Sequence, residues 1–301
     1  HPPTTGPRHD HPHANPVTTT PPPRGPPSGG IAPPLGTWVR RVSSPDSYRV
    51  PPDEIAARMV REVEAQISDL RRRGEGIAAF IADSVFSSDG IYTNPVNILA
   101  QVAKVVHAAG GIMIADEVQS GFARTGEHFW GYQRHGLDPD IVTLGKPMGN
   151  GYPVAAVAVA HDIVAEFGRD RRYFNTFGGN SVAMAAARAT LDYIRDANLQ
   201  GNAREVGAFI QTELRNMMPR AACIGDVRGA GLYIGVEIVQ PGTTLPDPQK
   251  TSEIVNELRN RHILLSSTGR DANILKIRPP LVFSHADAQR LCDALHDILT
   301  G

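Results

Sequence analysis

Amphipathic helical segments alternate with short apolar runs from residue 51 to residue 160, and this alternation constrains the fold more than any other feature. Helices are expected over about 53–73 and 95–109. The apolar runs between them, which are expected to be strands, are 77–82, 112–115, 141–144 and 154–160. Short strands without polar alternation, separated by helices, indicate a mostly parallel sheet covered on both faces. The sequence therefore predicts an α/β fold.

The first expected helix has the clearest pattern. Asp53 can cap its N-terminus, and the glycines Gly74 and Gly76 follow its end. One apolar stripe repeats along it at helical spacing: Ile55, Met59, Val63, Ile67 and Leu70. This stripe is expected to pack against the sheet.

The C-terminal third has a mixed pattern. Residues 181–217 look helical, and further helices are expected at 248–261 and 285–299. Strands are expected at 225–239 and 274–277. We therefore divide the chain into a large domain over residues 51–190 and a smaller α+β domain over residues 191–301.

Residues 1–50 differ in composition from the rest. Twelve of the 25 prolines lie within the first 34 residues, with few aliphatic side chains. Such a segment cannot bury enough apolar surface to offset the entropy of ordering it, so it is expected to be disordered or polyproline-like. His9, His11 and His13 could bind a metal ion adventitiously, but no dedicated metal site is expected.

Charge and cysteine content narrow the class of protein. The 30 basic and 31 acidic residues nearly cancel, so neither nucleic acid nor an anionic membrane is expected as a partner. Cys223 and Cys292 are too few for a disulfide framework and match no zinc pattern. With no long apolar run or signal segment in the sequence, a cytoplasmic location is expected.

Two side chains follow neighbouring strands where a ligand is expected. Asp116 comes directly after the strand 112–115, and Lys146 comes just after the strand 141–144. Ligands of open parallel sheets bind outside the carboxyl ends of the strands. Pyridoxal phosphate needs such a pair, a lysine to bond it and a carboxylate to keep its pyridine nitrogen protonated. Taken singly, an aspartate after a strand is more often a helix cap or turn former, and a lysine in such a loop is more often solvated.

The sequence around both residues resembles a known family. Residues 114–126 read Ile-Ala-Asp-Glu-Val-Gln-Ser-Gly-Phe-Ala-Arg-Thr-Gly, and residues 139–153 read Pro-Asp-Ile-Val-Thr-Leu-Gly-Lys-Pro-Met-Gly-Asn-Gly-Tyr-Pro. Together they resemble the signature of class III aminotransferases, which have the pyridoxal-phosphate-dependent transferase fold of type I. The resemblance extends over roughly residues 44–300. It implies that residues 51–190 are part of the cofactor-binding domain and that the protein is a homodimer with a shared active site.

The resemblance also implies roles for individual residues. Asp116 would pair with the pyridine nitrogen, Val118 would pack on a ring face, and Gln119 would hydrogen-bond the phenolic oxygen. Lys146 would bond the cofactor covalently and move a proton between substrate and cofactor. Thr176, in Asn-Thr-Phe-Gly-Gly-Asn, would reach the cofactor phosphate of the neighbouring subunit.

Two more residues would bind the substrates, which are a small amino donor and a keto acceptor. Arg278, in Leu-Lys-Ile-Arg-Pro-Pro-Leu, matches the arginine that takes a substrate carboxylate. Asp83 lies where many members carry a glutamate that pairs with this arginine. Asp83 is one methylene shorter, so its reach to Arg278 is left open.

The resemblance implies transaminase activity and leaves two alternatives. Members of the family carry a long N-terminal part that supplies the phosphate-binding turn and a ring-stacking aromatic residue, and nothing in residues 1–50 resembles it. The chain by itself is therefore expected to bind pyridoxal phosphate weakly, which leaves open an inactive scaffold. Phe-Ala-Arg at 122–124 and Asp-Ser-Val-Phe at 83–86 are closer to relatives that eliminate phosphate from phosphorylated amino alcohols and to alanine–glyoxylate enzymes.

Overall fold

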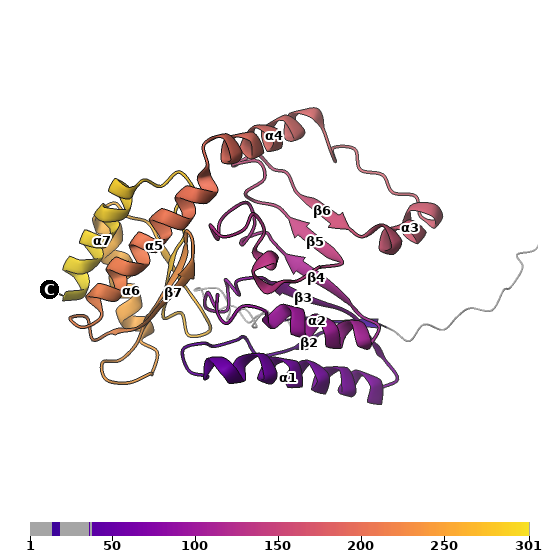
Figure 1. Ribbon diagram of the computed structural model, residues 1–301, viewed down its shortest axis with the longest axis horizontal. Coiled ribbons are helices and arrows are strands. Elements are labelled where there is room, and N and C mark those ends of the chain that lie inside the picture. Colours follow the sequence, from indigo (N-terminus) through magenta and orange to yellow (C-terminus); the bar gives the residue numbers. More distant parts are fainter. Residues whose placement is uncertain (1–13, 19–35, 37, 301) are drawn as a thin grey trace, which may run out of the picture.

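A computed structural model describes residues 14–18, 36 and 38–300, which form two sheets (Figure 1). The larger sheet has the strand order β2-β1-β3-β4-β5-β6. Its strands are β1 (Ala14–Thr18), β2 (Arg40–Arg41), β3 (Gly76–Asp83), β4 (Ile112–Asp116), β5 (Ile141–Leu144) and β6 (Ala156–Val159). Neighbouring strands pair in parallel except β6, which is antiparallel to β5. The expected mostly parallel sheet is confirmed.

Residues 14–18 and 38–50 differ from the expected disorder. Strand β1 pairs with both β2 and β3, and Val42 is buried in the core under the first helix. The Arg40 guanidinium donates to the Asp69 carboxylate at 3.1 Å. Burial of Val42 and this ion pair supply the contacts that the proline-rich composition lacks. The remaining residues of the expected segment, including His9, His11 and His13, lie outside the described residues.

Two helices cover one face of the large sheet, α1 (Pro52–Arg72) and α2 (Ile98–Ala108). The whole predicted stripe of α1 is buried, from Ile55 to Leu70. The predicted cap is wrong: Pro51 is the N-cap residue and no side chain caps it, because Pro52 already has the fixed φ that starts a helix. Asp53 lies in the first turn instead.

The expectation that helices cover both faces is not met by the described residues. Along β4, Met113 and Ala115 are fully buried against the helices, whereas Ile112, Ile114 and Asp116 alternate with them and are half-buried. Since side chains alternate between the faces of a strand, the half-buried set faces away from α1 and α2.

Three helices connect the sheets: α3 (His161–Asp170), α4 (Ser181–Asp196) and α5 (Leu199–Met217). The sequence analysis did not expect α3, whose residues are all exposed or half-buried. The expected helical region 181–217 is divided at Asn198, which has a left-handed φ of 48° and serves as the N-cap residue of α5.

The smaller sheet is antiparallel, with the order β7-β8-β10-β9. Its strands are β7 (Ile224–Ala230), β8 (Tyr233–Ile238), β9 (Ser266–Thr268) and β10 (Ile274–Ile277). The expected strand 225–239 is a hairpin, because Gly231 turns the chain with φ 52°. Helices α5, α6 (Pro248–Asn260) and α7 (His285–Thr300) pack on this sheet around a second core (Figure 1). The expected smaller α+β part is confirmed.

Candidate active site

The carboxyl ends of three neighbouring strands bring the candidate residues to one edge of the large sheet. Asp83 of β3 pairs in register with Asp116 of β4, which pairs in register with Thr143 of β5. Lys146 follows β5 after one glycine. Parallel strands bind ligands at this edge, so the predicted aspartate and lysine lie where one ligand can reach both.

The Asp116 carboxylate is oriented by two neighbours. Its Oδ1 accepts a hydrogen bond from the backbone N–H of Val118 at 3.1 Å and from the hydroxyl of Thr143 at 3.3 Å. Both bonds end on Oδ1, so within the described part of the chain Oδ2 has no donor. Asp116 is half-buried, and Oδ2 can therefore accept a hydrogen bond from a ligand.

Lys146 lies in an exposed turn next to this carboxylate. Partial burial of its amine and the nearby Arg278 lower the Lys146 pKa, while Asp116 and Asp83 act in the opposite direction. No described residue makes a hydrogen bond or ion pair with the Lys146 amine. The Val118 side chain lies beside the same turn, 3.6 Å from where a Cβ on Gly145 would stand. An amine with a lowered pKa and no partner is suited to act as a nucleophile.

Gln119 joins the large sheet to the small one. Its side-chain N–H donates to the Ser87 hydroxyl oxygen at 2.5 Å. Its amide oxygen accepts from three donors: the Tyr233 hydroxyl at 3.0 Å, the Arg278 guanidinium at 3.1 Å and the Lys276 ammonium at 3.2 Å. One oxygen therefore holds two cations of the small domain at the edge of the site.

Asp83 does not pair with Arg278. Its carboxylate accepts from the backbone N–H groups of Val85 and Ser87, both at 3.0 Å, and from the Ser87 hydroxyl. The local turn therefore uses both carboxylate oxygens, and Arg278 binds Gln119 instead. Burial raises the Asp83 pKa, which the hydrogen bonds from Ser87 and the backbone oppose.

Thr176 is not brought together with the other candidates. It lies in the exposed loop between α3 and α4, and no hydrogen bond of this chain joins it to Asp116 or Lys146. A hollow of about 720 Å³ lies between strands β5 and β6 and the loop around residues 173–179. Thr143 and Leu144 at the end of β5 are among its lining residues, so the hollow lies beside the Asp116–Lys146 edge.

Three residues of the site were not predicted from the sequence: Ser87, Tyr233 and Lys276. Lys276 had a detectable signal, because residues two apart on a strand share a face and Arg278 was already a candidate. Burial, followed by the charges of Arg278 and Lys146, lowers the Lys276 pKa to about 8. Its ammonium also lies 5.7 Å from the centre of the Tyr233 ring.

The site carries an excess of positive charge. Arg124 is half-buried and donates to the carbonyls of Leu232 and Pro279. Burial and the nearby Arg278 lower the Arg124 pKa to about 10. Among the described residues, the cationic side chains of Arg124, Lys146, Lys276 and Arg278 influence one another's pKa values, and the Asp83 and Asp116 carboxylates lie near them. Such an arrangement favours an anionic ligand.

Two features are absent from the described residues, a cluster of metal-ligating side chains and a membrane-spanning helix. No group of three or more His, Cys, Asp or Glu side chains there could hold a metal ion. In the same residues, no helix is both long enough and apolar enough to cross a membrane.

The chain is similar in sequence to known proteins. The chain is 37% identical to alanine–glyoxylate aminotransferase 2-like of Drosophila melanogaster over 91% of its length and 57% of the relative's. It is 40% identical to ethanolamine-phosphate phospho-lyase homolog 1 of Caenorhabditis elegans over 79% of its length and 52% of the relative's. The chain thus spans little more than half the length of these relatives.

A solved structure and a family model also match this chain. The structure of a phospholyase from Arthrobacter in complex with phosphoethanolamine has a TM-score of 0.88 and 37% identity, covering 95% of this chain and 70% of that one. The family model described as aminotransferase class-III matches residues 32–299. The chain belongs to the class III aminotransferase family.

Proposed function

We propose that the protein moves amino groups between small molecules with pyridoxal phosphate held at the Asp116–Lys146 edge. The observation that carries this proposal is that the Lys146 amine, which has no partner among the described residues, lies at the same sheet edge as a carboxylate whose Oδ2 is open to a ligand donor. These groups fit the cofactor, because its pyridine N–H needs an acceptor and its aldehyde needs a nucleophilic amine. When bound, the cofactor supplies an electron sink for the substrate carbon that carries the amino group.

Each residue has one task in this proposal. Asp116 would hold the proton on the pyridine nitrogen, Val118 would pack on the ring, and Gln119 would hydrogen-bond the phenolic oxygen. Lys146 would bond the cofactor and would take the proton from the substrate carbon. Its lowered pKa increases the fraction of neutral amine near pH 7, which both steps require.

The substrates would bind on the small-domain side. Arg278 would bind the carboxylate of an amino donor or of a keto acceptor through two parallel hydrogen bonds. Asp83 would act indirectly, because its bonds to Ser87 help to hold the serine that faces Gln119.

The first experiment identifies the lysine that bonds the cofactor. Borohydride reduction in millimolar pyridoxal phosphate, followed by peptide mapping, should label Lys146. Lys276 is the matched control, because its pKa of about 8 makes it the competing nucleophile in the same site. We expect Lys146→Ala to lose the label and Lys276→Ala to keep it. A label on Lys276 in the unmodified protein would refute the assignment, and no label at all would favour the inactive scaffold.

A phospho-lyase that eliminates phosphate from a phosphorylated amino alcohol is the second candidate. The excess of cations around Gln119 favours it, because Lys276 and Arg278 together suit a doubly charged phosphate better than a carboxylate. The Caenorhabditis and Arthrobacter relatives carry phospho-lyase names.

Two assays separate the candidates. One measures phosphate released from phosphoethanolamine, and the other measures amino transfer from alanine to glyoxylate. Removing a charge-assisted bond costs about 1.5–3 kcal/mol, so Lys276→Ala should lower phosphate release about 10- to 100-fold. In a transaminase, Arg278→Lys should instead weaken the carboxylate substrates by a similar factor. Transfer without phosphate release would exclude the second candidate.

Three further expectations belong to this proposal. We propose that residues 51–190 and 191–301 form two domains, and that two chains share each active site through Thr176. The cytoplasmic location stays a prediction, and two relatives from Arabidopsis thaliana and Homo sapiens are named as mitochondrial.

A further inference from the structure

The loop that follows β3 has an unfavourable backbone. Phe86 and Ile91 both have left-handed φ values, 48° and 60°, and Ile91 is β-branched. The backbone N–H groups of Asp89, Gly90 and Ile91 all donate to one oxygen, the Phe86 carbonyl, at 3.0–3.1 Å. Surrounding contacts must hold such a conformation in place, because the local sequence does not favour it.

Arg228 of β7 supplies the contact on one side of this loop. Its Nε donates to the carbonyl oxygens of Gly90 at 3.0 Å and Ile91 at 3.1 Å, and its Nη2 donates to Gly90 at 2.7 Å. No other described donor reaches these two carbonyls. The guanidinium also lies over the Tyr92 ring, 4.6 Å from its centre. One buried side chain therefore holds the end of the loop.

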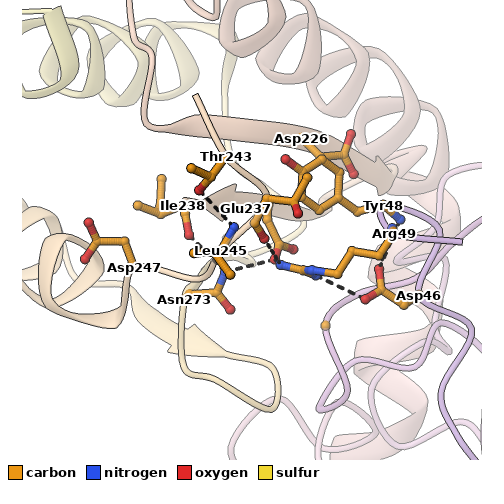
Figure 2. A network of polar contacts seen from close by, with 12 residues as sticks. Asp46, Tyr48, Arg49, Asp226, Glu237, Ile238, Thr243, Leu245, Asp247 and Asn273 are labelled. Atoms are coloured by element: carbon orange, nitrogen blue, oxygen red, sulfur yellow. Dashed lines mark hydrogen bonds and ion pairs between the residues drawn. The ribbon is translucent and has the colours of Figure 1, made fainter. Parts of the chain in front are cut away.

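Glu237 of β8 holds the guanidinium in turn. The Glu237 side chain is fully buried, and its Oε2 accepts from Arg228 at 2.8 Å. Its Oε1 accepts from Arg49 at 2.7 Å and from Asn273 at 2.8 Å, as Figure 2 shows. Because Arg49 precedes α1 and Asn273 precedes β10, this carboxylate joins three segments that are distant in sequence. The packing of the small sheet therefore keeps the Arg228 guanidinium in contact with the loop.

The other end of the loop reaches the site. The Ser87 hydroxyl donates to Asp83 and accepts from Gln119, whose oxygen holds Lys276 and Arg278. On the opposite edge of the small sheet, the Thr268 hydroxyl donates to the Ser87 carbonyl at 3.1 Å. A shift of the loop would therefore move Ser87 and, with it, the oxygen that orders the substrate-binding cations.

We propose that Arg228, anchored on Glu237, is a positioning residue that holds the loop over residues 84–92 so that Ser87 fixes Gln119 in the active site. This inference rests on the proposed function only for the identity of the bound cofactor and substrate. The contact of Arg228 with the loop does not depend on that function. The hydrogen bonds of Arg228 go to Gly90, Ile91, Asp226 and Glu237, and none goes to a residue proposed to bind cofactor or substrate. Arg228 acts through the backbone carbonyls of Gly90 and Ile91, which hold the loop, and from the loop through Ser87 to Gln119.

The test compares Arg228 of β7 with Arg215 of the neighbouring helix α5. Arg228→Lys keeps the charge opposite Glu237 but cannot reach both carbonyls with the geometry of a guanidinium. The control is Arg215→Lys: Arg215 donates to the carbonyl of Val227, the neighbour of Arg228, and does not contact the loop. Both variants and the unmodified protein are studied by amide hydrogen exchange and by borohydride labelling of Lys146 over a series of pyridoxal phosphate concentrations.

We expect Arg228→Lys to speed exchange of the amides of residues 89–91 by about tenfold or more, and Arg215→Lys to leave them unchanged. The cofactor concentration for half-labelling should rise about tenfold in Arg228→Lys alone. Ser87→Ala should reproduce the labelling defect while residues 89–91 stay protected, because it breaks the same connection at the far end.

The outcomes are distinguishable. Unchanged exchange in Arg228→Lys overturns the inference, and so does faster exchange with unchanged half-labelling. If Lys146 of the unmodified protein takes no label, the proposed function fails while exchange still tests the hold on the loop. Should Arg228→Lys not fold, Asp226→Ala removes the acceptor of the Arg228 Nη1 hydrogen bond at 2.9 Å and should speed exchange of residues 89–91 about threefold.

Discussion

Asp89 shows how a single buried carboxyl can set the pH dependence of stability. It is 6% exposed, and its Oδ1 has no hydrogen-bond partner in the described residues. Burial, followed by the charge of Asp83, raises the Asp89 pKa to about 8. In the unfolded chain the same carboxyl ionises near pH 4. Between these values unfolding releases a proton, so the stability that Asp89 contributes falls as the pH rises from about 4 to 8.

Asp89→Asn should therefore stabilise the protein at high pH, because an amide of the same shape cannot ionise. We expect the variant to be more stable than its parent by roughly 2–4 kcal/mol at pH 8, and by little below pH 4. Urea unfolding of the variant and its parent between about pH 4 and pH 8 measures this difference in the free energy of unfolding. The parent is measured beside the variant because other groups also change the stability with pH. Burial lowers the His135 pKa to about 4, so His135 loses its stabilising contribution as the pH falls. A constant difference between the two proteins would contradict the prediction.

Helix α5 is fixed to the small sheet by a close backbone approach. A Cβ on Gly207 would lie 2.1 Å from the carbonyl oxygen of Gly231 in the β7–β8 turn. Backbone atoms cannot move aside as a flexible side chain can, so this position accepts only glycine. The same helix carries much of the second core, and its placement determines where Tyr233 enters the site.

Two glycine-to-alanine substitutions in helices should therefore have opposite effects. Gly207→Ala should destabilise the protein by about 2–3 kcal/mol, because it overpacks α5 against the turn. Gly168→Ala in the exposed helix α3 meets nothing within 4 Å and should stabilise by up to about 1 kcal/mol. Thermal unfolding measures both. Equal effects of the two substitutions would show that helix propensity, and not the close approach, governs Gly207.

The whole molecule exposes an apolar region next to the site. Large side chains stand out of the loop and helix that follow α3, namely Tyr173, Phe174, Phe177, Val182, Leu191 and Tyr193, each more than 40% exposed. Thr176 lies among them. An exposed apolar region of this kind is typical of a subunit interface, which supports the proposed homodimer.

A shared site predicts complementation between two inactive variants. Lys146→Ala and Thr176→Ala damage the same site from different subunits, so a mixed dimer would contain one site with both defects and one intact site. Mixing and reassociating the variants should give activity above that of either, up to about a quarter of the unmodified protein. Activity no greater than the average of the two variants would show that Thr176 serves the site of its own chain.

Local patterns in the sequence determined much of this protein. The stripe from Ile55 to Leu70 identified the first helix and its buried face, since helical spacing alone decides which side chains share a face. The short apolar runs identified a mostly parallel sheet. Asp116 and Lys146 follow two of these runs, so parallel pairing necessarily brings them to one edge.

Only the tertiary structure decided the other half of the site. Gln119 meets Lys276 and Arg278 across more than 150 residues, and the packing of one sheet against the other selects such contacts. Asp83 could have bonded Arg278 or its own turn, and the fold of the loop 84–92 decided for the turn. That loop is held by Arg228 from the other sheet. Local propensity cannot encode contacts of this kind, because their energy arises only when both sheets are in place.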